Sequence, residues 1–110
     1  IPSKVPPIAL KLNDGVRIKL PDSLSLITPY VIQEQGQWFE KEIHFIHEFL
    51  EPGMQALDIG ANFGVYTLPM AKILGPEGAL WAFEPTSTTA AYLSDSLDEN
   101  GFCNVELIQV

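Results

Sequence analysis

The sequence is poor in basic residues. Six Lys and Arg stand against 14 Asp and Glu in 110 residues, which gives a formal net charge of −8, and no basic residue follows Lys72. A surface of this sign offers little to neutralise phosphates or anionic lipid headgroups. We therefore expect no nucleic acid and no membrane surface as a partner.

Long apolar runs and cysteines are also scarce. No apolar run approaches the ~20 residues of a membrane-spanning helix. The opening Ile1-Pro2-Ser3-Lys4 is neither a leader peptide nor an initiator methionine, so we expect the native start to have been removed. The single Cys103 allows no disulfide within the chain and no multi-cysteine zinc site. We expect it to be a small buried side chain in a protein of a reducing compartment, the cytoplasm.

The first third of the chain has a period-two apolar pattern. The pattern is interrupted by Asn13-Asp14-Gly15, a turn sequence that ends in glycine. Several prolines block long helices here. We expect residues 1–35 to form a small β-hairpin appendage and residues 36–110 to form the main domain. The alternating apolar residues are Ile8, Leu10, Leu12, Val16, Ile18 and Leu20.

From Phe39 the apolar spacing changes to three and four residues, which predicts an amphipathic helix that stops at Pro52-Gly53. Its predicted apolar stripe contains Phe39, Ile43, Ile46 and Leu50, widened by Phe45 and Phe49. The other face carries Glu40, Lys41, His44, His47 and Glu48. The spacing of His44 and His47 could present two imidazoles to a metal, but no third ligand is identifiable, so we expect no metal site.

The remaining chain alternates predicted strands and helices. Strands are expected at 56–59, 79–83 and 105–110, and helices at 66–74 and 87–100. Residues 79–83 are apolar throughout, as in a strand covered on both faces, with Trp81 filling the interior. This order predicts an α/β fold with a parallel sheet and right-handed crossovers. Only one side of a doubly wound sheet is present, so we expect the first half of a larger domain, inactive by itself.

One group of residues has the pattern of a ligand-binding site. It consists of Asp58-Ile59-Gly60-Ala61-Asn62-Phe63-Gly64 and of Glu84, which follows the next predicted strand. Gly60 and Gly64 allow a sharp strand-to-helix turn that a ligand can approach closely. The N–H groups that open the following helix favour an anionic ligand group. An acid at the end of the adjacent strand can accept hydrogen bonds from two ribose hydroxyls. The pattern therefore predicts a ribose-containing ligand.

S-adenosylmethionine fits this turn better than a dinucleotide. A dinucleotide fingerprint needs a third glycine where Asn62 stands, and the turn has no Lys or Arg to offset a pyrophosphate. In this interpretation the turn and helix N–H groups bind the carboxylate, Asp58 faces the ammonium group and Glu84 holds the ribose. Three alternatives stay open: a structural turn without ligand in which Glu84 caps a helix and Asp58 shapes the turn, a non-catalytic nucleoside-binding or assembly module, and a nicotinamide-dependent oxidoreductase.

At this point the sequence resembles the FkbM-type family of S-adenosylmethionine-dependent methyltransferases over about residues 36–110. The words that carry the resemblance are Gly53-Met54, residues 57–64, Tyr66-Thr67-Leu68, Ala71, Gly75-Pro76 and Phe83-Glu84-Pro85, with the aromatic and acidic stretch 38–42 before them. Pro69 departs from the family, which usually has an aliphatic residue there. The resemblance implies an incomplete Rossmann-like class I methyltransferase fold with the first three parallel strands. It also implies methyl transfer to a hydroxyl of a sugar or small secondary metabolite, with S-adenosylmethionine bound by Asp58, Gly60, Ala61, Asn62, Phe63, Gly64, Tyr66, Glu84 and Pro85.

Such a reaction is a direct displacement in which an acceptor oxygen attacks the sulfonium methyl group from behind. The protein mainly has to align three atoms and exclude water. A hydroxyl acceptor would also benefit from a general base, for which Glu40 and Glu42 are the candidates. Their expected place on a solvated helix face leaves the catalytic residues unassigned.

Overall fold

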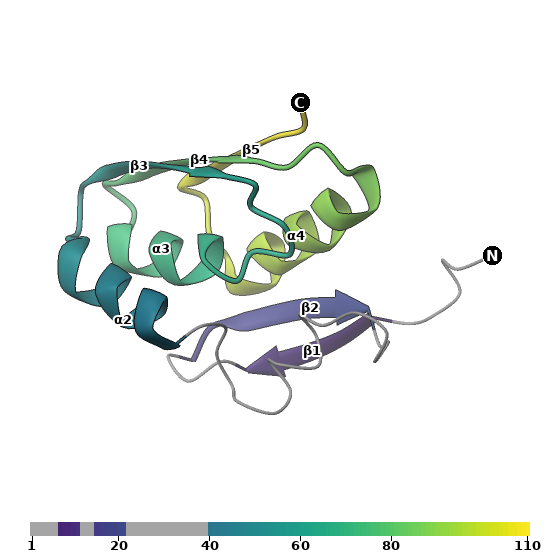
Figure 1. Cartoon of the computed structure of the whole chain (residues 1–110), viewed down its shortest axis with the longest axis horizontal. Coiled ribbons are helices and arrows are strands. Elements are labelled where there is room, and N and C mark those ends of the chain that lie inside the picture. Colours follow the sequence, from purple (N-terminus) through teal and green to yellow (C-terminus); the bar gives the residue numbers. More distant parts are fainter. Residues whose placement is uncertain (1–6, 12–14, 22–39) are drawn as a thin grey trace.

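The computed structural model describes residues 7–11, 15–21 and 40–110. These residues form three layers, namely a three-stranded sheet, a layer of helices and a two-stranded hairpin (Figure 1). In chain order the elements are β1 (Pro7–Lys11), β2 (Arg17–Pro21), α2 (Glu40–Phe49), β3 (Gln55–Ile59), α3 (Thr67–Leu74), β4 (Ala79–Phe83), α4 (Ser87–Asn100) and β5 (Val105–Ile108). None of the described helices is long and apolar enough to cross a membrane.

The larger sheet is parallel and has the strand order β3-β4-β5. Ile59 pairs with Phe83, and Phe83 pairs with Ile108, so the three strands end at the same edge. The predicted α/β fold with alternating strands and helices is therefore confirmed. This common edge collects the turn after β3 and the loop after β4, which carry the candidate site.

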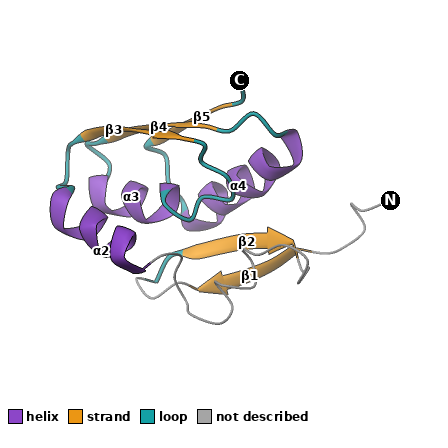
Figure 2. Cartoon of the chain, in the orientation of Figure 1, coloured by secondary structure: helices purple, strands orange, loops and turns teal. Residues whose placement is uncertain are grey.

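The described helices all lie on one face of this sheet, between the sheet and the hairpin (Figure 2). Leu68 of α3, Leu93 of α4 and Ala82 of β4 share a buried core with Ile18 and Leu20 of β2. Burying such aliphatic side chains contributes about 1.5–3 kcal/mol each. The core therefore ties the hairpin to the helix layer.

The predicted hairpin is present, with β1 and β2 antiparallel and Ile8 opposite Leu20. It is also hydrogen-bonded to α4, because the Lys19 N–H donates to Ser96 Oγ over 2.8 Å. Of the predicted turn, only Gly15 is described. Leu12, Asn13 and Asp14, Phe39, and the boundary predicted between residues 35 and 36 lie outside the described residues.

Two predictions about the apolar stripe of α2 and the burial of β4 were wrong. Phe45 and Phe49 are 64% and 62% exposed and stack on each other, whereas Ile43 faces the interior. Trp81 and Phe83 are only half-buried, whereas Leu80 and Ala82, which alternate with them along β4, are buried. The described helices cover only one face of the sheet, and side chains alternate between the two faces along a strand (Figure 2). Cys103, expected to be buried, is exposed and free.

The bounds of α4 are those that the sequence predicts, and α3 begins at Thr67, one residue after its predicted start. Pro69 is the third residue of α3, where its missing N–H has no intrahelical partner to lose. Asn104, just before β5, holds the other end of α3, since its Nδ2 donates to the carbonyls of Ala71 and Gly75 over 2.9 Å each. Gly101 ends α4 in the left-handed conformation with φ 69°.

Candidate functional site

The chain reverses between β3 and α3 through a tight turn, residues 60–64, which we call the glycine turn. Gly60, Asn62 and Gly64 have φ values of 77°, 57° and 100°, all left-handed. Asn62 is the one non-glycine residue with positive φ among the described residues. Asparagine tolerates this conformation better than most residues, so it can stand where a dinucleotide fingerprint has its middle glycine.

The two glycines have different functions in the turn. A Cβ on Gly60 would meet no atom within 4 Å, so the space beside it is open. A Cβ on Gly64 would lie 2.5 Å from Leu93 Cδ1 and 3.3 Å from Leu68 Cγ. Both glycines were expected to let a ligand approach closely, but the missing side chain at Gly64 leaves room for the packing of Leu93 from α4.

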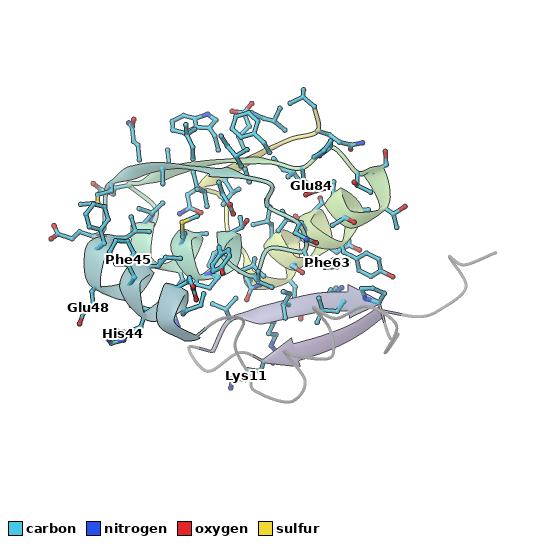
Figure 3. All side chains as sticks on the ribbon, viewed as in Figure 1. Lys11, His44, Phe45, Glu48, Phe63 and Glu84 are labelled. Atoms are coloured by element: carbon cyan, nitrogen blue, oxygen red, sulfur yellow. The ribbon has the colours of Figure 1, made fainter. Side chains whose placement is uncertain are left out.

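Glu84 follows β4 and contacts the glycine turn directly. Its Oε1 accepts the Asn62 N–H over 2.8 Å, and its Oε2 accepts the Thr86 N–H over 3.1 Å. Figure 3 shows the side chain where β4 leads into α4, and it is 7% exposed. Because Thr86 is the N-cap of α4 and makes no side-chain cap itself, Glu84 also caps this helix, as one of the open alternatives supposed. A carboxylate oxygen has two lone pairs, so each oxygen keeps capacity for one more hydrogen bond.

Most N–H groups of the glycine turn are already hydrogen-bonded inside the protein. Gly60 and Ala61 both donate to the Phe83 carbonyl over 2.9 Å, and Gly64 donates to the Ala61 carbonyl over 3.0 Å. With Asn62 bonded to Glu84, four donors of the turn are engaged. A ligand carboxylate would have to break one of these bonds to use them. The predicted carboxylate contacts with these four groups are therefore not supported.

Asp58 lies near the end of β3 and is partly buried. Burial raises the pKa of the Asp58 carboxyl above its ordinary value, and the hydrogen bond from Thr67 lowers this pKa and so offsets part of the rise. That bond runs from Thr67 Oγ1 to Asp58 Oδ2 over 2.5 Å. Asp58 borders an open pocket of about 490 Å³, which we call the Asp58 pocket, lined by Glu42, Phe45, Ile46, Leu57, Asp58, Tyr66 and Met70.

The other predicted site residues are distributed over the core and the surface. Ala61 and Phe63 are buried, and Phe63 packs edge-on against Tyr92 with ring centroids 5.8 Å apart. Tyr66 lines the Asp58 pocket. Pro85 is exposed and lines an apolar groove of about 470 Å³ together with Gly60, which we call the Pro85 groove.

Sequence reasoning missed two features of the Asp58 pocket. Glu42 is exposed, as predicted, but together with Phe45 of α2 it also borders this open pocket, which the sequence did not indicate. It also passed over Thr67, a fully buried polar residue in an otherwise apolar helix turn. The sequence signal for this contact is a hydroxyl residue at the first position of a predicted helix, nine positions after an acidic residue of the preceding strand.

The histidines of α2 lie on its outer face. His44 Nε2 is 3.4 Å from Glu48 Oε2, and both side chains are largely exposed (Figure 3). Such an exposed i,i+4 pair contributes little to stability. Within the part of the chain that the structure describes, no three His, Cys, Asp or Glu side chains are grouped as metal ligands would be.

No family model matches the chain. Over 59 residues the chain is 36% identical to the protein-L-isoaspartate O-methyltransferase of Methanothermobacter thermautotrophicus, a match that covers 54% of this chain and 27% of that protein. The chain thus spans about a quarter of this relative's length. The fold is similar to that of a SAM-dependent methyltransferase from Aquifex aeolicus, with TM-score 0.55 and 27% identity over 64% of this chain and 37% of that one.

A further similar structure corrects the expectation about nucleic acid. A Clostridium thermocellum protein assigned as an rRNA methylase matches with TM-score 0.63 and 20% identity, covering 67% of this chain and 40% of that one. The exclusion of nucleic acid from net charge was therefore wrong. The charge of a segment does not decide which acceptor a longer protein binds, because acceptor contacts depend on local patches.

The Aquifex aeolicus protein is described as SAM-dependent, in agreement with the predicted cofactor, whereas neither of these comparisons confirms the FkbM-type family. The predicted fold class is confirmed. Over three parallel strands, this chain has the incomplete, Rossmann-like α/β fold of the S-adenosylmethionine-dependent methyltransferases.

Proposed function

We propose that this chain forms the cofactor-binding part of an S-adenosylmethionine-dependent methyltransferase. The observation that carries the proposal is the contact between Glu84 and the Asn62 N–H, which brings the acid after β4 onto the turn after β3. Beside this contact, Gly60 leaves open space and Pro85 lines an apolar groove. An acid next to an open turn at the common edge of parallel strands is the arrangement that a nucleoside with a free ribose requires.

The charges of the site favour a cationic ligand over a dinucleotide. Residues 42–71, which supply the glycine turn and the Asp58 pocket, contain no Lys or Arg. Asp58 and Glu42 both border that pocket. S-adenosylmethionine carries a sulfonium and an ammonium group, whereas a pyrophosphate would meet carboxylates here. This arrangement disfavours the nicotinamide-dependent alternative.

In this proposal Asp58 faces the ammonium group, Glu84 accepts from the ribose with its remaining lone pairs, and Gly60 lets the ligand pass close to the backbone. Four of the other predicted residues shape the glycine turn, namely Ala61, Asn62, Phe63 and Gly64. Tyr66 lines the Asp58 pocket, and Pro85 lines the Pro85 groove. S-adenosylmethionine supplies a methyl group on a positively charged sulfur, which makes the leaving group good. What remains for the protein is alignment and exclusion of water, worth up to ~7–11 kcal/mol in model reactions.

We further propose a hydroxyl of a sugar or small secondary metabolite as the acceptor, in an FkbM-type enzyme. The sequence motifs at residues 57–64 and Phe83-Glu84-Pro85, which resemble those of the FkbM-type family, support this acceptor. A hydroxyl acceptor loses its proton as the new carbon–oxygen bond forms, and Glu42 is a general-base candidate because it lines the Asp58 pocket. Glu40, the other candidate, begins α2, but its side chain lies outside the described residues. An exposed, free Cys103 fits a reducing compartment, and we propose the cytoplasm.

The decisive experiment is mass spectrometry of small molecules that copurify with the complete protein carrying this sequence, followed by calorimetric titration with S-adenosylmethionine and with NADH. We expect S-adenosylmethionine or its demethylated product to copurify, and the first titrant alone to bind. Binding of NADH alone refutes the proposal in favour of an oxidoreductase. Binding of neither refutes it in favour of a non-catalytic module.

A pair of glycine variants tests the position of the ligand. Gly60→Val fills the open space beside the turn, whereas Gly75→Val places the same side chain at a similar φ of 70°, also in open space, at the far end of α3. Both substitutions strain the backbone, since Gly75 combines its positive φ with a ψ of −177°, a conformation nearly restricted to glycine. We expect Gly60→Val to lower the affinity for S-adenosylmethionine at least tenfold and Gly75→Val to leave it within about twofold. Equal affinities of the two variants would place the ligand elsewhere.

A further inference from the structure

The hydroxyl of Thr67 has no explanation in packing. Thr67 is fully buried at the first position of α3. A valine would fill nearly the same volume without burying a polar atom, and a buried polar atom costs free energy unless it is hydrogen-bonded. The hydroxyl donates to Oδ2 of Asp58 over 2.5 Å. This hydrogen bond lowers the pKa of the Asp58 carboxyl.

We infer that Thr67 is a positioning residue, whose buried hydroxyl holds the Asp58 carboxylate ionised and oriented so that it can receive the ammonium group of the cofactor in the Asp58 pocket. The inference rests on the proposed function. A hydrogen bond from a neutral hydroxyl favours the charged form of a carboxylate. With Oδ2 engaged, the carboxylate cannot turn freely about its side chain, and Oδ1 is left to the ligand.

The surroundings of Asp58 make this hydrogen bond important. Burial raises the pKa of Asp58, so burial disfavours the charge that an ammonium group needs. Among the described lining residues, the titratable groups that share the pocket with Asp58 are Glu42 from α2 and Tyr66 at the start of α3, and none of these lining residues is basic. On β4, the residue paired with Asp58 is Ala82, which cannot titrate. Before a ligand enters, Thr67 therefore supplies the stabilisation of the anion that the pocket lining lacks.

The test compares Thr67→Val, which keeps the shape and removes the hydroxyl, with Thr67→Ser, which keeps the hydroxyl. Thr88→Val, at an exposed position of α4, is the matched control. Two quantities are measured in the complete protein: the titration of the Asp58 carboxyl by NMR with labelled aspartate, assigned with Asp58→Asn, and the affinity for S-adenosylmethionine from about pH 5 to about pH 8.

In Thr67→Val we expect the Asp58 pKa to rise, because the group that lowers it is gone. The affinity should then fall roughly tenfold at the acid end of the range and much less at the basic end, where Asp58 is ionised in both proteins. Thr67→Ser should restore the wild-type profile, and Thr88→Val should not change it.

An Asp58 titration that is the same in Thr67→Val and the wild type overturns the inference. So does a raised pKa with an unchanged pH profile of binding, because Asp58 would then not contact the ammonium group. If the wild-type protein binds no S-adenosylmethionine, the proposed function fails, and with it the cofactor role of Thr67. The NMR titration still decides separately whether Thr67 controls the charge of Asp58.

Discussion

Replacing Glu84 by glutamine should destabilise the fold before any ligand is considered. The carboxylate accepts two backbone N–H groups, from Asn62 in the glycine turn and from Thr86 at the N-terminus of α4. An amide keeps one acceptor oxygen and places an NH₂ group where the other oxygen stands. In Glu84→Gln one of the two N–H groups therefore faces another donor.

The size of the effect follows from the two hydrogen bonds. A hydrogen bond to a charged group contributes about 1.5–3 kcal/mol, and Glu84 is 7% exposed, so water replaces the lost acceptor poorly. We expect Glu84→Gln to lower the free energy of unfolding by about 2–3 kcal/mol. Glu84→Ala removes both acceptors and should lower it by about 3–5 kcal/mol.

Urea unfolding followed by circular dichroism measures both values. Glu77→Gln, in the exposed turn between α3 and β4, makes the same change of charge without a buried contact and should stay within about 0.5 kcal/mol of the wild type. If Glu84→Gln unfolds at the same urea concentration as Glu77→Gln, the carboxylate does not hold the turn and helix together, and the reasoning is refuted. Cofactor affinities of Glu84 variants are informative only where unfolding shows that they are folded.

Three further comparisons, made with four variants, test other parts of the structure by the same unfolding measurement. Gly64→Ala should cost about 3 kcal/mol or more, because its Cβ would clash with Leu93 at a φ of 100°, whereas Gly60→Ala should cost only the backbone strain of about 1–2 kcal/mol; equal losses would contradict the packing role. Asp58→Asn should gain stability relative to the wild type as pH rises from about 4 to about 7. The folded-state pKa of Asp58 is raised, so the protonated carboxyl of the wild type stabilises the fold below the unfolded-state pKa, and this stabilisation is lost as pH rises through the folded-state pKa. A difference in the free energy of unfolding between the two proteins that does not change with pH would contradict this sign. Asn104→Ala removes two hydrogen bonds to the last carbonyls of α3 and should cost about 1–2 kcal/mol, and no loss would show that water replaces the amide.

The order and type of the elements could be predicted because they depend on local patterns. Alternating residues around Gly15 predicted the hairpin, and the three-and-four spacing of Ile43, Ile46 and Leu50 predicted α2, where the structure has both. The glycine turn was also recognisable, because a strand that reverses into a helix needs left-handed backbone positions within a few residues. These features involve residues close together in the chain, so their energetics are visible in a short window.

Tertiary packing alone decided which residues of the site contact one another and which face open space. Nothing near Gly64 in the sequence shows that Leu93 will lie against it, and Glu84 meets Asn62 only because β3 and β4 pair in parallel. The exposed stack of Phe45 and Phe49 likewise reflects where α2 lies on the helix layer, since apolar periodicity does not state which part of a stripe finds a partner. The sequence by itself determined the local elements and the chemistry available at the turn, whereas contacts between residues 20 to 30 positions apart depend on how layers pack, and packing is a property of the assembled chain.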